Sequence, residues 1–391
     1  MAEWVECTIG DLCDTISDTY KGNDENVILV NTSDVLEGKV LNHIQVPNKN
    51  LKGQFKKTFR KNDILFSEIR PANKRFAFVD FEDTSNYIAS TKLMVLRHNE
   101  KVLPEYLFAI LKSNYILAEL QHLAETRSGT FPQITFTSEL APMKVNLPDK
   151  KTQKQIVSIL SSIEQKIDAN ESINDNLYEM VNAYYTSLFK DVECEMTTIG
   201  NYAERIYSGG TPTTSNAAYW GGTFGWFSSG ETRNRFVIST EKSITQTGID
   251  NSSTKLASKH DIVMASAGQG FTRGQTSMLL IDTYVNQSVI VIHADRNILP
   301  YLFWNLANRY EELRAISDSS SIRGSLTTKM IAAFEIPLAN NDVIQTFSDF
   351  AWAVIPQIEN NLLENERLAA LRDSLLPKLM SGELDVSAVE L

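Results

Sequence analysis

The stretch IVSILSSIEQKIDANESINDNLYEMVNAYYTSL, residues 156–188, returns in altered form as FSDFAWAVIPQIENNLLENERLAALRDSLLPKL, residues 347–379. Residues alternately four and three apart are mostly apolar in both stretches, which is the pattern of a helix with one face against a partner helix. Asparagine interrupts that face at the same two slots, Asn170 and Asn174 in the first copy and Asn361 and Asn365 in the second. Matched interruptions at a constant offset of 191 residues indicate a duplicated chain.

The two long helices are expected to pair with each other. Each apolar face covers 33 residues, or about 50 Å of helix at 1.5 Å per residue, which is too long to bury within one modest domain. An antiparallel pair sets Asn170 near Asn365 and Asn174 near Asn361. Such polar pairs fix register and orientation at some cost in stability. The helices then form a rigid spacer.

The rest of the chain repeats as well. The first half has strand-like alternation to about residue 100, a helix from Leu103 to about Ala124, and a short strand before the long helix. The second half repeats these elements, with Asn62-Asp63-Ile64 matched by His260-Asp261-Ile262 and Leu103-Pro104 by Leu299-Pro300. We therefore predict an α+β fold. Two duplicated, strand-rich mixed α/β domains, residues 1–148 and 194–338, are held apart by two long antiparallel coiled-coil helices, residues 149–193 and 339–391, about a pseudo-twofold axis.

Composition excludes several classes of protein. The chain is 42% hydrophobic and 22% charged, which is typical of a globular domain. No apolar run approaches the roughly 20 residues that span a bilayer, and the start lacks a signal-peptide pattern. The three cysteines, Cys7, Cys13 and Cys194, are too few and too scattered for a disulfide framework or a zinc cluster. We expect a cytoplasmic protein without membrane partners.

Charge is unevenly distributed along the chain. The net charge of −11 argues against a nucleic-acid partner on average. Between Lys49 and Arg75, however, nine Lys and Arg face only Asp63 and Glu68. Nine like charges in a short run repel one another unless an anion lies nearby, so this run is a candidate phosphate-binding segment.

No catalytic pattern is present in the sequence. The five histidines are scattered without metal-ligand spacing. Gly268-Gln269-Gly270 with Gly274 fits neither a dinucleotide loop nor a P-loop, and we interpret it as a turn between strands. Asp63 with Glu68 resembles a nuclease acidic pair, but a strand with solvated charges explains both residues better. We expect a non-enzyme with no catalytic residue, bound cofactor or metal.

Recognition chemistry is concentrated in loops. The second half contains Ser208-Gly209-Gly210-Thr211-Pro212-Thr213 and a Gly- and Trp-rich run from Tyr219 to Glu231. Clustered glycines let a backbone approach a partner closely, and Ser, Thr and Glu231 can contact base edges or phosphates; Trp220 and Trp226 are expected in the core. The candidate DNA-binding residues are Lys52, Lys56, Lys57, Arg60, Arg70, Lys74, Arg127, Thr211, Thr213, Ser228, Ser229, Arg233, Arg235, Arg273 and Arg323.

These features together resemble the specificity subunit of type I restriction–modification systems. The resemblance rests on Ser208-Gly209-Gly210-Thr211-Pro212 leading to Tyr219-Trp220-Gly221-Gly222, on Asn286-Gln287-Ser288, and on the closing run from Leu375 to Leu384. The first half matches by layout, since its corresponding loop, Ser17 to Asn26, lacks Gly-Thr-Pro.

The resemblance implies two target-recognition domains, each binding one half of a split double-stranded DNA site, with the helices setting the spacer between the halves. It also implies docking of two methyltransferase subunits that carry S-adenosylmethionine, and of restriction and translocase subunits that use ATP and Mg. This chain then carries out neither reaction.

Two alternatives remain at this stage. One is a non-enzymatic scaffold that binds protein or carbohydrate through two β-rich domains on a coiled-coil spacer. The other is a stand-alone restriction or methylation enzyme, which the missing cofactor and metal motifs disfavour. Clustering of the candidate cations on one surface favours DNA, whereas scattered cations favour the scaffold.

Overall fold

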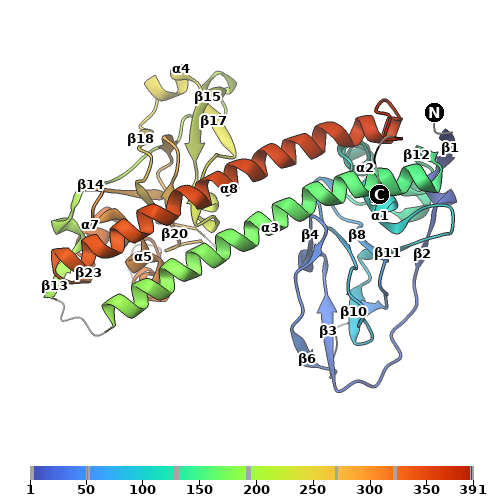
Figure 1. The fold of residues 1–391 in the computed structure, drawn as a ribbon, viewed down its shortest axis with the longest axis horizontal. Coiled ribbons are helices and arrows are strands. Elements are labelled where there is room, and N and C mark those ends of the chain that lie inside the picture. Colours follow the sequence, from blue (N-terminus) through green and yellow to red (C-terminus); the bar gives the residue numbers. More distant parts are fainter. Residues whose placement is uncertain are drawn as a thin grey trace. The chain divides into compact units, whose positions relative to one another are not determined.

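The computed structural model describes residues 4–49, 51, 53–126, 132–190, 195–268, 272–319, 324–387 and 389. The chain forms two compact units: unit 1 comprises Met1–Ile167 and Arg367–Leu391, and unit 2 comprises Asp168–Glu366. The long helices α3 (Lys150–Phe189) and α8 (Asn341–Ser381) are each divided between the two units (Figure 1). The sequence predicts residues 149–193 and 339–391 as spacer helices outside the two domains. In the structure, each long helix contributes residues to both units.

Unit 1 contains two four-stranded sheets. The antiparallel sheet has the order β2 (Cys13–Ile16), β11 (Leu93–His98), β8 (Ile64–Ser67) and β9 (Phe76–Phe78). The mixed sheet has the order β6 (Gln45–Pro47), β3 (Asn26–Val30), β10 (Tyr87–Ser90) and β7 (Phe55–Lys57), with β3 and β10 parallel. Two short pairs complete the unit, β1 (Trp4–Thr8) with β12 (Lys144–Pro148) and β4 (Val35–Leu36) with β5 (Lys39–Val40).

Unit 2 repeats this topology. Its larger sheet has the order β14 (Ala203–Ser208), β22 (Val289–Ala294), β19 (Ile262–Ala265), β20 (Thr276–Leu279) and β16 (Phe236–Val237). Its mixed sheet has the order β17 (Lys242–Ile244), β15 (Trp220–Phe227), β21 (Thr283–Val285) and β18 (Lys255–Ala257), with β15 and β21 parallel. β13 (Glu195–Thr198) pairs with β23 (Glu335–Leu338). The predicted duplication is therefore confirmed, although β16 has no counterpart in unit 1 and the pair β4–β5 has none among the described strands of unit 2.

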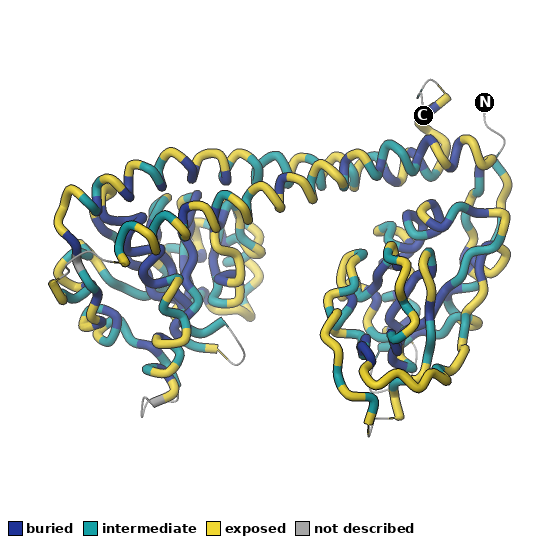
Figure 2. Tube along the Cα trace, turned by 60° about the horizontal axis from the view of Figure 1, so that its bottom comes forward, coloured by how far each residue is buried: buried dark blue, intermediate teal, exposed yellow. Residues whose placement is uncertain are grey.

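The central strands are apolar on both faces because both faces are buried. In β8, Ile64 and Phe66 pack in the core that contains the helices, and Leu65 packs in the core between the two sheets. In β19, Ile262 and Met264 pack with the helices of unit 2, and Val263 packs between its sheets. Figure 2 shows buried residues gathered in the interior of each unit. Each unit is thus a layered domain of two sheets and helices.

The helical region of unit 1 differs from the prediction. The sequence predicts one helix to about Ala124, but the structure has α1 (Pro104–Leu111) and α2 (Asn114–Thr126). Ser113 lies at the break, where its Oγ accepts a hydrogen bond from the Ile116 backbone N–H at 3.3 Å. Serine caps a new helix in this way. Unit 2 has the corresponding pair α5 (Leu299–Asn308) and α6 (Tyr310–Ser319), with short helices α4 (Gln246–Asp250) and α7 (Thr328–Ala332).

Both long helices begin with a side-chain cap at the same place in the repeat. Asp149 accepts from the Thr152 N–H at 2.9 Å, and Asn340 accepts from the Val343 N–H at 3.0 Å. The hydrogen bond from the Thr152 backbone N–H is the main cause that lowers the pKa of Asp149, and the hydrogen bond from the Thr152 hydroxyl adds to it. Desolvation acts in the opposite direction, with a smaller effect than the N–H. These caps satisfy backbone donors that a helix leaves free at its first turn.

The helices pair antiparallel within unit 2, as predicted. Asn170 Nδ2 donates to Asn365 Oδ1 at 2.9 Å, and Asn361 Nδ2 donates to Asn174 Oδ1 at 2.8 Å. Tyr184 packs against Phe350 with ring centroids 4.7 Å apart. Residue numbers rise along one helix as they fall along the other, so the register follows the sequence repeat. That the asparagines determine this register stays a prediction.

Candidate nucleic-acid interface

The basic run of unit 1 divides into exposed and engaged cations. Lys56 and Arg60 are exposed. Lys57 is half-buried, and its ammonium donates to the carbonyl oxygens of Thr91 at 3.1 Å and Leu93 at 2.8 Å. Burial lowers the pKa of Lys57. Lys57 thus ties β7 to neighbouring backbone, which the sequence did not reveal, and Lys56 and Arg60 are the better candidates for phosphate. Lys52 lies outside the described residues.

Arg70 and Lys74 flank the turn at Pro71–Asn73, and both adopt left-handed backbone conformations with φ of 46° and 52°. Both side chains are exposed. Lys74 Nζ lies 3.2 Å from Glu37 Oε1, an exposed pair that contributes little to stability. Arg70 and Lys74 stay predicted DNA contacts, and Arg127 lies outside the described residues.

The acidic residues of this region are structural. Asp63 is 1% exposed and accepts from Arg97 through Nε at 2.8 Å and Nη2 at 2.7 Å. Hydrogen bonding to Asp63 is the main cause that raises the pKa of Arg97. Glu68 lies 3.5 Å from Lys92. A nuclease-like pair is therefore absent at these two positions.

The glycines of the Gly-Gly-Thr-Pro run pack inward. A Cβ on Gly209 would lie 1.9 Å from the Val285 carbonyl oxygen, and a Cβ on Gly210 would lie 2.1 Å from Ser253 Oγ. A Cβ on Gly222 would lie 2.3 Å from the Ile244 carbonyl oxygen. The expectation that these glycines admit a partner is wrong, because the chain itself occupies the space. Their role is to let the loop close against the mixed sheet.

The polar residues of these loops also have internal partners. Thr211 Oγ1 donates to Gln287 Oε1, and Thr213 contributes its carbonyl oxygen to the Trp220 indole N–H at 3.3 Å. Trp226 is buried, as predicted, and donates to the Gly210 carbonyl oxygen at 3.2 Å, whereas Trp220 is only half-buried. The hydroxyl of Thr213 has no hydrogen-bond partner recorded within the described part of the chain, so Thr213 remains the freer of the two threonines.

Glu231 is a capping residue rather than a base-reading one. It is 4% exposed, and its Oε1 accepts from the Ser228 N–H at 2.8 Å and the Ser228 hydroxyl at 3.0 Å. Its Oε2 accepts from the Glu241 N–H at 2.9 Å. Ser229 contributes its carbonyl oxygen to Thr232 Oγ1 at 2.8 Å. Ser228 is therefore held within the turn, and the expectation for Glu231 is wrong because its carboxylate is already satisfied.

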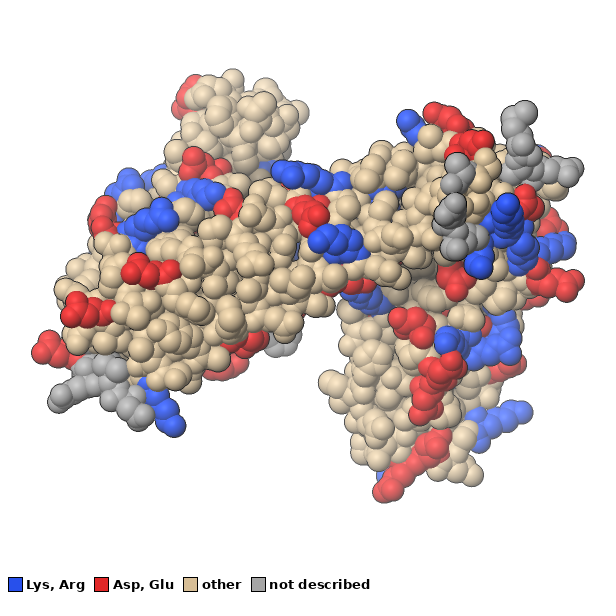
Figure 3. All heavy atoms as spheres, in the orientation of Figure 1, with Lys and Arg blue, Asp and Glu red and all other residues tan. Residues whose placement is uncertain are grey.

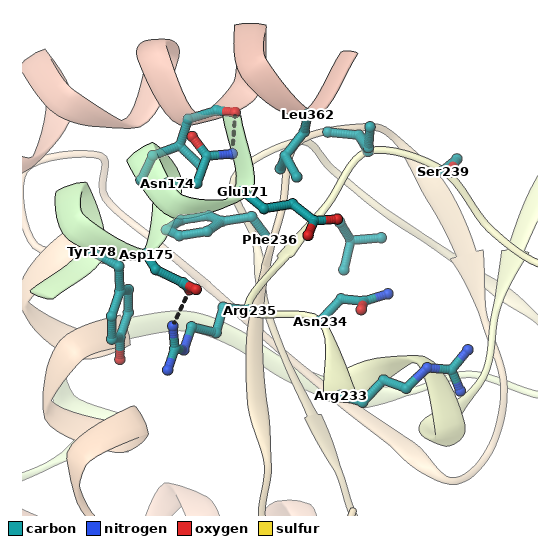
Figure 4. A pocket seen from close by; sticks show the side chains of 13 residues that line it. Glu171, Asn174, Asp175, Tyr178, Arg233, Asn234, Arg235, Phe236, Ser239 and Leu362 are labelled. Atoms are coloured by element: carbon teal, nitrogen blue, oxygen red, sulfur yellow. Dashed lines mark hydrogen bonds and ion pairs between the residues drawn. The ribbon is translucent and has the colours of Figure 1, made fainter. Parts of the chain in front are cut away.

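The predicted arginines of unit 2 that the structure describes are each paired with a carboxylate. Arg233 pairs with Glu241, Arg273 with Asp318, and Arg235 with Asp175 at 3.2 Å. Figure 4 shows Arg235 turned toward Asp175 on α3, and its guanidinium lies 4.2 Å from the Tyr178 ring centroid. A phosphate would have to displace these carboxylates, and the three arginines stay predicted DNA contacts. Arg323 lies outside the described residues.

A cavity of about 580 Å³ lies beside Arg235, between the paired helices and the segment from Arg233 to Ser239 (Figure 4). Its lining mixes Phe236 and Leu362 with the Asp175–Arg235 ion pair. Carboxylate and guanidinium neutralise each other there, so the cavity offers no strong charge to a ligand.

Three other cations of unit 2 were missed by the sequence analysis. Arg205, Lys242 and Lys255 are exposed, and no carboxylate pairs with them in the described part of the chain. Each lies over an aromatic ring: Arg205 and Lys255 over Tyr207 at 5.9 and 5.6 Å, and Lys242 over Trp220 at 5.8 Å. Arg205 lies two residues before Tyr207 on β14, whereas Lys242 and Lys255 come near their aromatic residues only through the fold.

Charges of both signs are mixed elsewhere on the surface. On the face drawn in Figure 3, Lys and Arg of unit 2 lie beside Asp and Glu along α8, while the lobe of β15, β17 and α4 is mainly uncharged. Within the described ranges no group of three or more His, Cys, Asp or Glu is arranged to hold a metal ion. No described helix is long and apolar enough to cross a membrane.

Comparison with known proteins identifies the family. The model of the type I restriction modification DNA specificity domain matches twice, over residues 1–179 and 192–364. The chain belongs to this family. Each match covers one copy of the duplication that the sheets display.

Relatives and a solved structure agree with that assignment. The specificity subunit of the type I restriction enzyme HindI from Haemophilus influenzae is 29% identical, over 98% of this chain and 100% of the relative. The EcoR124I/EcoR124II specificity subunit from Escherichia coli is 25% identical over 71% of this chain and 68% of the relative. The S subunit of a type I system from M. genitalium shares the fold with a TM-score of 0.54 at 16% identity, over 97% of this chain and 96% of that one. The DNA-specificity interpretation is confirmed over the scaffold alternative.

Proposed function

We propose that this specificity subunit binds a bipartite DNA site, with unit 1 recognising one half and unit 2 the other. The double match to the specificity-domain model is the observation that carries the proposal. Two copies of one recognition fold in a single chain supply two reading surfaces, and their loops differ. The Gly-Gly-Thr-Pro loop, for example, occurs only in the second copy. Different loops bind different base sequences, since base edges carry the sequence information.

The chemical steps belong to partner subunits in this proposal. Two methyltransferase subunits bring S-adenosylmethionine, and restriction and translocase subunits bring ATP and Mg. The relatives are named specificity subunits of restriction enzymes, which supports a non-catalytic role in a larger complex. A complex that acts on cellular DNA in this way works in the cytoplasm.

The exposed side of α3 supports a partner surface in unit 2. Ile173 and Met180 are 42% and 45% exposed on that side, one heptad apart. Neighbouring exposed positions are small or uncharged: Ala169, Ser172, Asn176, Ala183 and Ser187. A helix face without charge is suited to packing against another helix. We propose that a methyltransferase subunit covers it.

Methylome sequencing tests the function. Cells that carry this chain with its neighbouring subunits are compared with cells that lack it, and a new split methylation motif is expected. Replacing residues 1–148 with the same domain of a relative should change one half of that motif. A change in both halves would contradict separate recognition by the two units, and no new motif in any of these cells would contradict the specificity role.

A further inference from the structure

The outer face of the mixed sheet in unit 2 is aromatic and partly exposed. Tyr284 on β21 lies opposite Leu256 on β18 and opposite Trp226 on β15, so these side chains share one face of the sheet. Phe224 lies two residues before Trp226 on that face, and its ring packs edge-on against Tyr284 at 6.0 Å. Phe224 and Leu256 are 37% and 49% exposed. Buried apolar residues on the opposite face of the sheet account for its stability, so Phe224 and Leu256 are available to a partner.

A stack of side chains lies at the β18 edge of the sheet, on the side opposite Leu256, because Lys255 pairs with the inward-facing Val285 and Tyr207 packs against the same core. Tyr207 Oη donates to the Leu256 carbonyl oxygen at 2.7 Å, which uses a carbonyl that the edge strand would otherwise leave free. Arg205 and Lys255 both lie over this ring. Burial raises the pKa of Tyr207 to about 12, with Asp261 adding to the effect and Arg205 opposing it. Tyr207 therefore stays a neutral hydrogen-bond donor.

The opposite edge carries a third cation. Lys242 on β17 lies across from Trp226, which places it on the same outer face as the aromatic side chains. Glu204 precedes Arg205 in the sequence, but its carboxylate lies 3.6 Å from His293 Nε2 and does not pair with Arg205. Cations without carboxylate partners can bind the phosphates of a polyanion, and exposed aromatic residues beside them can pack against its apolar groups.

We propose that this aromatic face, formed by Phe224, Leu256 and Tyr284 and flanked by Arg205, Lys242 and Lys255, is the surface through which unit 2 contacts DNA. The inference rests on the proposed function and adds where the contact is made. Arg205 and Lys255 bind backbone phosphates, with Tyr207 holding both in place. Phe224 and Leu256 contact sugars and apolar base edges such as the thymine methyl group. Arg233, Arg235 and Arg273 differ from these three cations, since each lies beside a carboxylate.

A paired substitution tests the cations. The double variant R205Q/K255Q is compared with K190Q/K329Q, which removes the same charge from exposed residues of the same unit outside the proposed surface. Each full-length chain is assembled with its methyltransferase subunits. Binding to a fluorescent duplex carrying the motif found by methylome sequencing, and to one lacking it, is measured over a salt series. R205Q/K255Q should flatten the salt slope by about 1.8, corresponding to two phosphates, and K190Q/K329Q should leave it close to that of the unchanged complex.

A second variant tests the apolar contacts. F224S/L256S should weaken binding to the motif-bearing duplex while keeping the salt slope, since it removes no charge. Thermal melting checks that each variant is folded. Unchanged binding in both R205Q/K255Q and F224S/L256S, or weakened subunit assembly with normal DNA affinity, would overturn the proposed surface. Failure of the unchanged complex to distinguish the two duplexes would instead contradict the proposed function.

Discussion

Nδ1 of His293 donates to Oδ1 of Asp261 at 2.5 Å, in the place where unit 1 has Arg97 against Asp63. Asp63 and Asp261 are both 1% exposed, and both accept a backbone N–H from three residues earlier, from Arg60 at 2.8 Å and from Ser258 at 2.9 Å. The duplication has thus kept the buried carboxylate and exchanged its cationic partner. The carboxylate organises the turn into the central strand in each unit.

Removing the carboxylate should destabilise each unit. In D63A, the Arg97 guanidinium and the Arg60 N–H lose their acceptor, and breaking such a buried pair costs about 3 kcal/mol. In D261A, the lost bonds include a histidine instead of an always-charged arginine, so the cost is expected to be smaller, about 2 kcal/mol. Urea unfolding of the full chain measures both, with the exposed E119Q as control. Equal stability of D63A and the unchanged chain would contradict this account.

His260 should make the stability of unit 2 depend on pH. The His260 ring centroid lies 4.7 Å from that of Trp352. Burial is the main cause that lowers the pKa of His260, and the positive charges of Lys259 and Arg296 lower it further. The negative charges of Glu359 and Asp261 oppose this with smaller effects. The unfolded chain, with a value near 6.5, therefore binds this proton more readily than the folded chain. Stability is retained above that value and lost as pH falls below it.

The substitution H260N tests the pH effect without disturbing the backbone. His260 has φ of 78°, and Asn62 holds the same place in unit 1 with φ of 68°. Asparagine tolerates this left-handed conformation. The unfolding free energy of H260N should vary less between about pH 7 and 5 than that of the unchanged chain. The exposed H122N in unit 1 is the control, and equal pH dependence of H260N and the unchanged chain would contradict the prediction.

The asparagine pairs should show measurable coupling. Asn170 Nδ2 donates to Asn365 and, at 2.7 Å, to Glu364 Oε2. N170L should cost about 1–2 kcal/mol, because polar groups opposite it lose a partner. The double variant N170L/N365L should recover about 1 kcal/mol of that loss in a double-mutant cycle of unfolding free energies. Additive effects of the two substitutions would show that the pair does not act as a unit.

The periodic pattern of apolar residues in the sequence was enough to predict the main elements of the fold. The 191-residue repeat located both long helices, their antiparallel pairing and the duplicated domains, because apolar periodicity records which face of a helix is buried. The sequence could not predict which cations are free to bind DNA, because that depends on contacts between residues far apart in the chain. The partners of Lys57 and Arg235 are 34 and 60 residues away in sequence, so a count of basic residues cannot distinguish free cations from engaged ones.

Local chemistry misled the analysis at the glycines, since a Gly-Gly pair looks the same whether it faces a partner or packs inward. Gly209→Ala should destabilise unit 2 severely, because the new Cβ would lie 1.9 Å from the Val285 backbone. Gly230→Ala, where the nearest atom is Ser228 Oγ at 4.0 Å, is the matched control and should change stability by less than about 1 kcal/mol. Thermal melting distinguishes them, and a fully stable Gly209→Ala chain would contradict the inward packing.

The basic run of unit 1 should contribute to DNA affinity through two side chains rather than three. K56A/R60A removes exposed charge and should weaken binding to every duplex alike, with a salt slope flatter by about 1.8 if each side chain binds one phosphate. K57A should act differently, because its ammonium bonds to Thr91 and Leu93 carbonyls. It should lower the melting temperature and leave the salt slope of the folded complex unchanged. The measurement is a salt series with the assembled complex, beside thermal melting of each variant. An unchanged slope in K56A/R60A would remove this run from the interface, and a flattened slope in K57A would show that Lys57 leaves its carbonyl partners to bind phosphate.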